Sequence, residues 1–138
     1  DSLAYFNRGN ALAELGQHGE AISDYSKVIG LNPEVADVYN CRGMSYAENG
    51  EFDNAIKDFD EAIKLDPEDA EVYFNKGNVY FSLKEFEKCL ELYDKSLDLG
   101  PDNPLVYYYR SLVNKQLERL DEAKDDYEHA LELGFEEE

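Results

Sequence analysis

Few side chains in this sequence have the types and spacing that catalysis or metal binding requires. The histidines and cysteines are His18, His129, Cys41 and Cys89. The histidines are far apart in the chain, and the cysteines lack the short Cys-x-x-Cys spacing of a metal site. Adjacent acids such as Asp125 and Asp126 point to different faces of a helix, so they do not form a catalytic carboxylate pair. Because phosphate-binding, zinc-protease and calcium-loop motifs are also absent, we predict that the chain is not an enzyme and holds no metal or cofactor.

The balance of charge restricts the partners. The 138 residues include 32 acidic and 13 basic side chains, which gives a net charge of −19. A field of this sign repels phosphate groups, so we expect no binding to nucleic acid or to membranes. The expected partners are proteins or peptides that are neutral to basic.

The beginning of the chain and its cysteines bear on its origin. It begins with Asp1 rather than Met, which indicates a segment of a longer protein, and its first residues lack the pattern of a signal peptide. It has only two cysteines and no N-glycosylation acceptor, which favours the cytoplasm or another reducing intracellular compartment.

The sequence repeats itself every 34 residues. The period is marked by Pro33, Pro67 and Pro101. Aligning on these prolines brings an aromatic, a basic and a small residue into register. These three columns are Tyr5, Tyr39, Tyr73 and Tyr107; Arg8, Arg42, Lys76 and Arg110; and Gly9, Gly43, Gly77 and Ser111. Three later columns are Ala21, Ala55, Cys89 and Ala123; Tyr25, Phe59, Tyr93 and Tyr127; and Val28, Ala62, Ser96 and Ala130. The chain therefore consists of four units, at about 2–35, 36–69, 70–103 and 104–137.

Each unit is predicted to form two helices, because apolar residues recur at helical spacing. The first helices are expected at 2–15, 36–49, 70–83 and 104–117, and the second at 19–31, 53–65, 87–99 and 121–133. Gly16 and Gly50 mark turns between the paired helices. Asp53, Asp102 and Asp121 lie near helix starts, where we expect them to cap free amides.

The small columns have a packing role. A glycine such as Gly9 or Gly43 has no side chain, so the paired helix can approach closely, with Ala21 or Ala55 on the other side. Cys89 occupies a small column and is expected in the core, while Cys41 is expected to be an ordinary small residue.

These columns resemble the tetratricopeptide repeat in all four units, over nearly the whole chain. The resemblance implies one all-α domain over residues 1–138, a right-handed superhelical solenoid of four helix–turn–helix repeats and eight antiparallel helices. It also implies a protein-interaction module or scaffold, whose first helices line a concave groove that holds a partner peptide.

The fourth unit departs most from the family pattern, with Ser111, Asn114 and Phe135 at positions that hold glycine, tyrosine and proline elsewhere. Family domains usually end with an additional helix that covers the last repeat, and none follows here. We therefore expect the apolar side of the last helix, including Tyr127 and Leu131, to be uncovered. This exposed side could associate with a second copy of the chain.

Offsets within the repeat give the candidate groove residues. They are Phe6, Asn7, Asn10, Asn40, Phe74, Asn75, Asn78, Phe81, Tyr108 and Tyr109. Asparagine amides can bond a peptide backbone, and aromatic rings supply contact area. The alternatives are that the asparagines only bridge neighbouring helices and that the aromatic residues are packing residues. Glu14, Asp37, Glu48 and Glu71 form an acidic rim.

Chaperone-binding members of the family hold a C-terminal carboxylate with Lys, Asn and Arg. The corresponding positions here are Phe6, Asn10, Cys41, Glu71 and Asn75, of which only Asn10 matches. We therefore expect no binding of a chaperone tail. Two other functions remain open: a regulatory or targeting segment of a larger enzyme, and a self-assembling scaffold.

Overall fold

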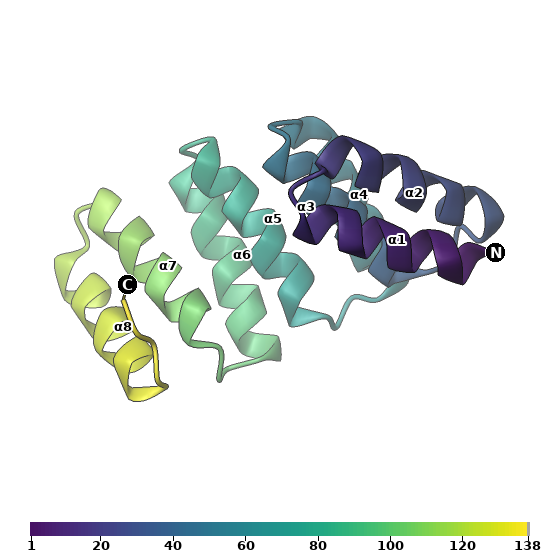
Figure 1. Ribbon diagram of the computed structural model, residues 1–138. Helices are drawn as coiled ribbons and strands as arrows, with labels where there is room; N and C mark the ends of the chain where they lie inside the picture. Colours follow the sequence, from purple (N-terminus) through teal and green to yellow (C-terminus); the bar gives the residue numbers. More distant parts are fainter. Residues whose placement is uncertain (138) are drawn as a thin grey trace. The chain divides into compact units, whose positions relative to one another are not determined.

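The structure is a computed structural model that describes residues 1–137, and these form eight helices and no strands. The helices are α1 (Ser2–Glu14), α2 (His18–Leu31), α3 (Ala36–Glu48), α4 (Phe52–Leu65), α5 (Ala70–Ser82), α6 (Phe86–Leu99), α7 (Pro104–Gln116) and α8 (Leu120–Glu132). Figure 1 shows each odd-numbered helix followed by its even-numbered partner. Every helix lies within about one residue of its predicted bounds. None of the helices in 1–137 has the length and apolar character needed to cross a membrane.

The turns inside the repeats share a left-handed residue. Gly16 and Gly50 both have φ +78°, a conformation that favours glycine because it has no Cβ. The same turn places Lys84 at φ 60° and Glu118 at φ 59° in the third and fourth repeats. The backbone path is therefore kept in all four repeats, although glycine marks it in the sequence of only two.

The expected helix caps are wrong. Side-chain caps come instead from Asp1, Asp69 and Asn103, each of which accepts a hydrogen bond from the amide two residues later. Asp53 and Asp121 are the second residues of α4 and α8, so each lies inside its helix rather than at the cap. Asp102 precedes the residue that caps α7. All three caps thus belong to first helices, where the chain arrives in an extended conformation or at its start.

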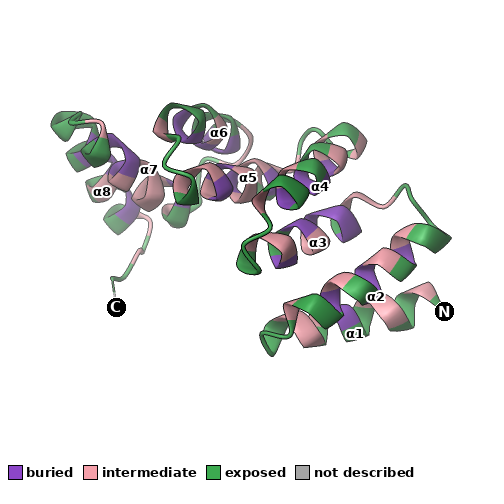
Figure 2. Ribbon diagram, turned by 90° about the horizontal axis from the view of Figure 1, so that it is seen from above, coloured by how far each residue is buried: buried purple, intermediate pink, exposed green. Residues whose placement is uncertain are grey.

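The chain divides into two compact units, with unit 1 at Asp1–Glu68 and unit 2 at Asp69–Glu138, so the division falls between the second and third repeats. In unit 1, the paired helices bury their facing sides, as the purple segments of α1 to α4 show in Figure 2. Its core includes Tyr25, Val28, Val38 and Phe59. In unit 2, the core includes Tyr93, Leu97, Val106 and Val113.

The glycine column allows an aromatic ring to approach the backbone. A Cβ on Gly43 would lie 2.8 Å from Phe59 Cε1, and one on Gly77 would lie 2.6 Å from Tyr93 Cε1. Gly9 has the same relation to Tyr25. The close neighbour is therefore the aromatic column and not the alanine column that the sequence suggested. Such distances are too short for any side chain, which explains why the position is glycine.

A bidentate ion pair joins the two helices in three repeats. The guanidinium groups of Arg8, Arg42 and Arg110 donate to Asp24, Asp58 and Asp126, at 2.7 to 2.8 Å. The three aspartates are buried, and each lies 16 residues after its arginine. In the third repeat, Lys76 and Leu92 occupy these positions, so both members of the pair differ together.

Candidate peptide-binding groove

In unit 1, a cavity of about 420 Å³ opens between α1, α2 and α3. We call it the unit 1 cavity. Its lining comprises Asn10, Ala13, Glu14, His18, Tyr25, Cys41, Met44, Ser45 and Glu48. Asn10 provides an amide, Cys41 and Met44 provide sulfur-bearing side chains, and Tyr25 provides a ring. Two carboxylates, those of Glu14 and Glu48, come from the last turns of α1 and α3. The cavity therefore combines a largely apolar wall with negative charge at one end of two first helices.

The asparagine column bonds to the aromatic column of the second helix. The Tyr25 hydroxyl donates to Asn10 Oδ1 at 2.7 Å, and the Tyr93 hydroxyl donates to Asn78 Oδ1 at 2.6 Å. In the second repeat, Met44 and Phe59 occupy these two positions, so the amide and the hydroxyl are absent together. Asn10 and Asn78 thus bridge the two helices of their own repeat, as in the alternative reading, and keep Nδ2 donors that this bond does not use.

The other predicted asparagines differ in exposure. Asn7 is exposed on α1, and Asn75 is half-buried on α5. Asn40 is only 7% exposed, so it has little surface to offer a peptide. Their contact with a ligand stays a prediction.

The predicted aromatic residues pack mainly against one another. In unit 2, the Phe74 and Phe81 rings lie 5.7 and 6.0 Å from the Tyr109 ring, which in turn lies 5.6 Å from Tyr108. Phe74 is 8% exposed and belongs to the core, whereas the other three are half-buried. In unit 1, Phe6 is half-buried and lies 6.1 Å from the Tyr25 ring. Edge-to-face packing of aromatic rings between α5 and α7 therefore uses much of the surface that was expected to meet a peptide.

The thiol and imidazole groups do not form a reactive site. Cys89 is fully buried, as expected from its column, and burial raises the pKa of its thiol to about 12. Cys41 is half-buried beside the core of unit 1, and both cysteines are free thiols. His18 Nδ1 is buried without a hydrogen-bond partner at the edge of the unit 1 cavity. Residues 1–137 contain no group of three His, Cys, Asp or Glu side chains that could hold a metal ion.

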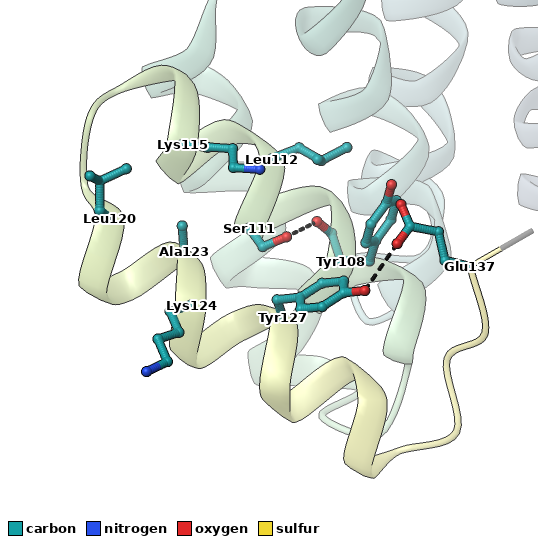
Figure 3. A pocket seen from close by; sticks show the side chains of 9 residues that line it. All are labelled: Tyr108, Ser111, Leu112, Lys115, Leu120, Ala123, Lys124, Tyr127 and Glu137. Atoms are coloured by element: carbon teal, nitrogen blue, oxygen red, sulfur yellow. Dashed lines mark hydrogen bonds between the residues drawn. The ribbon is translucent and has the colours of Figure 1, made fainter.

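In unit 2, a second cavity of about 410 Å³ is formed by α7, α8 and the tail that follows α8. We call it the repeat 4 cavity. It is lined by Tyr108, Ser111, Leu112, Lys115, Leu120, Ala123, Lys124, Tyr127 and Glu137, and Figure 3 shows all nine. The tail returns along α7, where the Phe135 ring stacks on Tyr108 with centroids 4.2 Å apart and an interplanar angle of 20°. The Tyr127 hydroxyl donates to Glu137 Oε2 at 3.0 Å, and this bond raises the pKa of Tyr127.

The tail changes the expected state of the last helix. Leu131 is 46% exposed, in agreement with the prediction of an uncovered side. For Tyr127 that prediction is wrong, because Glu137 reaches its hydroxyl. Sequence reasoning missed the tail because its two contacts lie outside the 34-residue period. It also missed the aspartate partners of the arginine column, although Asp24, Asp58 and Asp126 recur with the period and could have been found.

Comparison with known proteins addresses the family. The profile described as TPR repeat matches residues 9–50 and 43–84. Two profiles described as tetratricopeptide repeat match residues 70–103 and 105–133. No curated protein matches the chain in sequence.

Solved structures of similar fold cover nearly the whole chain. A crystal structure of MamA is 26% identical, with a TM-score of 0.89 over 96% of this chain and 78% of its own. MamA from Desulfovibrio magneticus RS-1, from residue 41 to its end, is 23% identical, with a TM-score of 0.87 over 96% of this chain and 75% of its own. The first TPR domain of Spaghetti (RPAP3), bound to the HSP90 peptide SRMEEVD, is 24% identical, with a TM-score of 0.81 over 85% of this chain and 93% of its own.

These likenesses identify the fold as an all-α solenoid of tetratricopeptide repeats. Such repeats are modules of protein interaction and not catalytic units, so the chain is a non-enzymatic interaction scaffold. The profile matches cover residues 9–84 without a gap, which is more than half of the sequence, and then continue to residue 133. The chain belongs to the tetratricopeptide-repeat family.

Proposed function

We propose that this scaffold holds a neutral-to-basic peptide of a partner protein against its first helices, and that the unit 1 cavity receives a basic side chain of that peptide. The observation that carries the proposal is the pair of carboxylates, Glu14 and Glu48, in a wall that is otherwise largely apolar. A lysine or arginine side chain suits this arrangement, because its alkyl stem can lie along Met44 while its charge reaches the carboxylates.

The peptide backbone would be held by amides. Asn7 is exposed on α1, and Asn10 lies in the wall of the same cavity. An asparagine offers two donors and an acceptor, which suits the alternating groups of an extended backbone. Unit 2, taken by itself, offers the same two kinds of group in Asn78 and in the half-buried rings of Phe81 and Tyr109.

A chaperone-type carboxylate clamp does not fit this site. The residues that line the unit 1 cavity include no lysine or arginine that could pair with a carboxylate. Glu14 and Glu48 would repel a peptide carboxylate in the same cavity. The proposal therefore excludes an acidic C-terminal tail as the ligand of unit 1.

The test is a binding titration with a fluorescein-labelled peptide of alternating lysine and leucine. The double variant Glu14→Gln with Glu48→Gln should weaken its binding about tenfold, since each exposed charge contributes up to about 1 kcal/mol. The matched control, Glu34→Gln with Glu68→Gln, removes two exposed charges of unit 1 outside the cavity and should change affinity little. Binding of the wild type should also fall as salt rises. Equal losses in both double variants, or tighter binding of a glutamate–leucine peptide of the same length, would contradict the proposal.

Self-association through α8 is a second candidate function, favoured by the exposure of Leu120 (65%) and Leu131 (46%). Sedimentation velocity over a range of protein and salt concentrations tests it. A sedimentation coefficient that rises with protein concentration, more steeply at high salt, is the expected result, because salt screens the repulsion between acidic copies. A monomer under all of these conditions would remove this candidate.

A further inference from the structure

The tail after α8 occupies a surface that has its own binding chemistry. Phe135 lies flat on Tyr108, and Glu137 accepts a hydrogen bond from the Tyr127 hydroxyl. The two contacts are made by residues two positions apart, one aromatic and one acidic. In Figure 3, Glu137 lies beside both tyrosines, at one side of the repeat 4 cavity. The surface thus holds a short segment of the type aromatic–any residue–carboxylate.

The rest of the cavity is not filled by the tail. It extends along α7 and α8 to Lys115, Leu120 and Lys124. Within residues 1–137, no carboxylate forms an ion pair with Lys115, and Lys124 has only a 3.9 Å contact with Glu128 one turn away. Two cations therefore line a cavity in a chain of net charge −19, and Glu137 bonds to Tyr127 rather than to either of them.

The two lysines stand at positions that are apolar in the third repeat. Lys115 corresponds to Phe81, whose ring packs against Tyr109 of the next repeat, and Lys124 corresponds to the buried Leu90. In unit 2, these two apolar residues belong to the core shared by the third and fourth repeats. A lysine is a poor residue for such an apolar contact, but it can pair with a carboxylate.

We propose that the repeat 4 cavity binds an acidic segment of a partner protein. An aromatic residue of this segment stacks on Tyr108, and the carboxylates that follow it bind Tyr127 and the two lysines. The chain's own tail is a weaker occupant that the segment must displace. The segment gains over the tail because its later carboxylates reach Lys115 and Lys124. We assign the segment to a different protein, because a second copy would bring its own net charge of −19 and would be repelled unless salt screens that charge. This site is separate from the unit 1 cavity and does not rest on the function proposed for it.

The probe is a labelled synthetic peptide, LGFEEEEE, which repeats the tail sequence and extends it by two glutamates. It is titrated against the full chain and against a tail variant, Phe135→Ala with Glu137→Gln. The attached tail competes at a high effective concentration, so the tail variant should bind the peptide at least about tenfold more tightly than the wild type. The peptides LGAEEEEE and LGFQQQQQ should bind about tenfold more weakly than the probe.

Two further variants locate the peptide. Lys115→Gln with Lys124→Gln, added to the tail variant, should lower affinity about tenfold, and these side chains lie on the cavity wall, so circular dichroism should show an unchanged fold. Glu14→Gln with Glu48→Gln should leave affinity for this peptide the same, which separates the site from the unit 1 cavity.

The proposal is overturned if the wild type and the tail variant bind the peptide with equal affinity, or if the lysine substitutions leave that affinity unchanged. No detectable binding to the tail variant at about 1 mM peptide would also reject it. Sedimentation that shows wild-type dimers, lost in the tail variant, would assign the segment to a second copy instead of a partner.

Discussion

Units 1 and 2 close their hairpins with the same contacts but present cavities of opposite charge. Gly43 against Phe59 in unit 1 matches Gly77 against Tyr93 in unit 2. The hydrogen bond from Tyr25 to Asn10 likewise matches the bond from Tyr93 to Asn78. These shared contacts lie between the paired helices, so they conserve the hairpin and leave its outer surface free to vary.

The cavities differ because they are lined by residues at outer columns, which are the repeat positions that do not take part in these shared contacts. Glu14 and Glu48 line the unit 1 cavity, whereas Lys115 and Lys124 line the repeat 4 cavity. Glu14 and Glu48 belong to one column of the repeat, and Lys115 lies one position before that column in the fourth repeat. In the fourth repeat the neighbouring position of the first helix carries the opposite charge, which changes the charge that a ligand meets. The backbone of the repeat fixes where a cavity forms, and the side chains at its outer columns decide what enters it.

The arginine–aspartate ion pair between the two helices is a shared contact that the third repeat lacks. Arg42 and Asp58 are paired in unit 1, but Lys76 and Leu92 replace them in the third repeat, in unit 2. Burying a charge requires a partner, whereas an apolar residue at the same place does not. The third repeat keeps its hairpin because the aspartate is lost and a leucine takes its position.

Of the variants that test this comparison, Arg42→Ala should lower the free energy of unfolding the most. Asp58 would remain buried without its partner, and the bond from Arg42 to Ser26 would also be lost. Removing one partner of a buried pair costs about 3–5 kcal/mol, and we expect about 3 because the Arg42 side chain is still 19% exposed. Chemical denaturation measures the change. Lys76→Ala in unit 2 should cost less than about 1 kcal/mol, since Leu92 needs no counter-charge. Equal losses in the two variants would remove the distinction between the repeats.

Gly43→Leu and Gly77→Leu should each destabilise their unit by about 1–3 kcal/mol, because a side chain would overlap Phe59 or Tyr93. The matched control is Gly30→Ala in α2, where a Cβ would meet nothing within 4 Å. There we expect a gain of up to about 1 kcal/mol from helix propensity. Thermal unfolding followed by circular dichroism checks all three. A loss in only one of the two units would show that the glycine contact is not a shared requirement.

Most of the fold could be predicted from the sequence, because a repeat reports the same structure four times. Gly43 and Gly77 stand at one offset, and a proline ends each of the first three units, so period and helix bounds follow from local chemistry. The turn residues Lys84 and Glu118 could not be recognised as left-handed from their type. They adopt this conformation because the packed helices on both sides determine the path of the turn.

The candidate site was harder to predict, because exposure depends on neighbours that the sequence does not name. Asn40 and Phe74 stand in groove columns, yet they are only 7% and 8% exposed. Phe135 stands at the proline position of the repeat and Glu137 belongs to no column. Both contact α7 and α8 only because the tail turns back at Gly134, with φ 97°. Periodicity predicts contacts that recur, and these contacts occur once.

Tyr25→Phe and Tyr93→Phe sharpen the comparison of the shared hydrogen bond. Each removes a hydroxyl that bonds to Asn10 or Asn78, and each should cost about 1 kcal/mol. Tyr127→Phe should cost less, because its acceptor is the exposed Glu137, which water can hydrate instead. Urea denaturation of the three variants measures the difference. If Tyr127→Phe cost the most, the tail rather than the asparagine column would be the stronger partner of these hydroxyls.

The smallest effect concerns pH and the ion pair of the first repeat, because the Arg8 side chain is 60% exposed and Lys27 also lies 3.9 Å from Asp24. The hydrogen bonds and charge of Arg8 hold the pKa of Asp24 below its ordinary value of 3.8. The unfolded chain therefore takes up this proton at a higher pH than the folded chain. The stabilisation is fully present above the unfolded pKa and is lost as pH falls through the folded one. The melting temperature of Arg8→Met should thus lie below that of the wild type at pH 7, and the two should converge below about pH 4.

Lys57→Met, at an exposed position of unit 1, is the control and should show no such convergence. A gap between Arg8→Met and the wild type that stays constant down to pH 2.5 would mean that Arg8 stabilises unit 1 by packing on Tyr5, 5.7 Å from its ring, and not through Asp24.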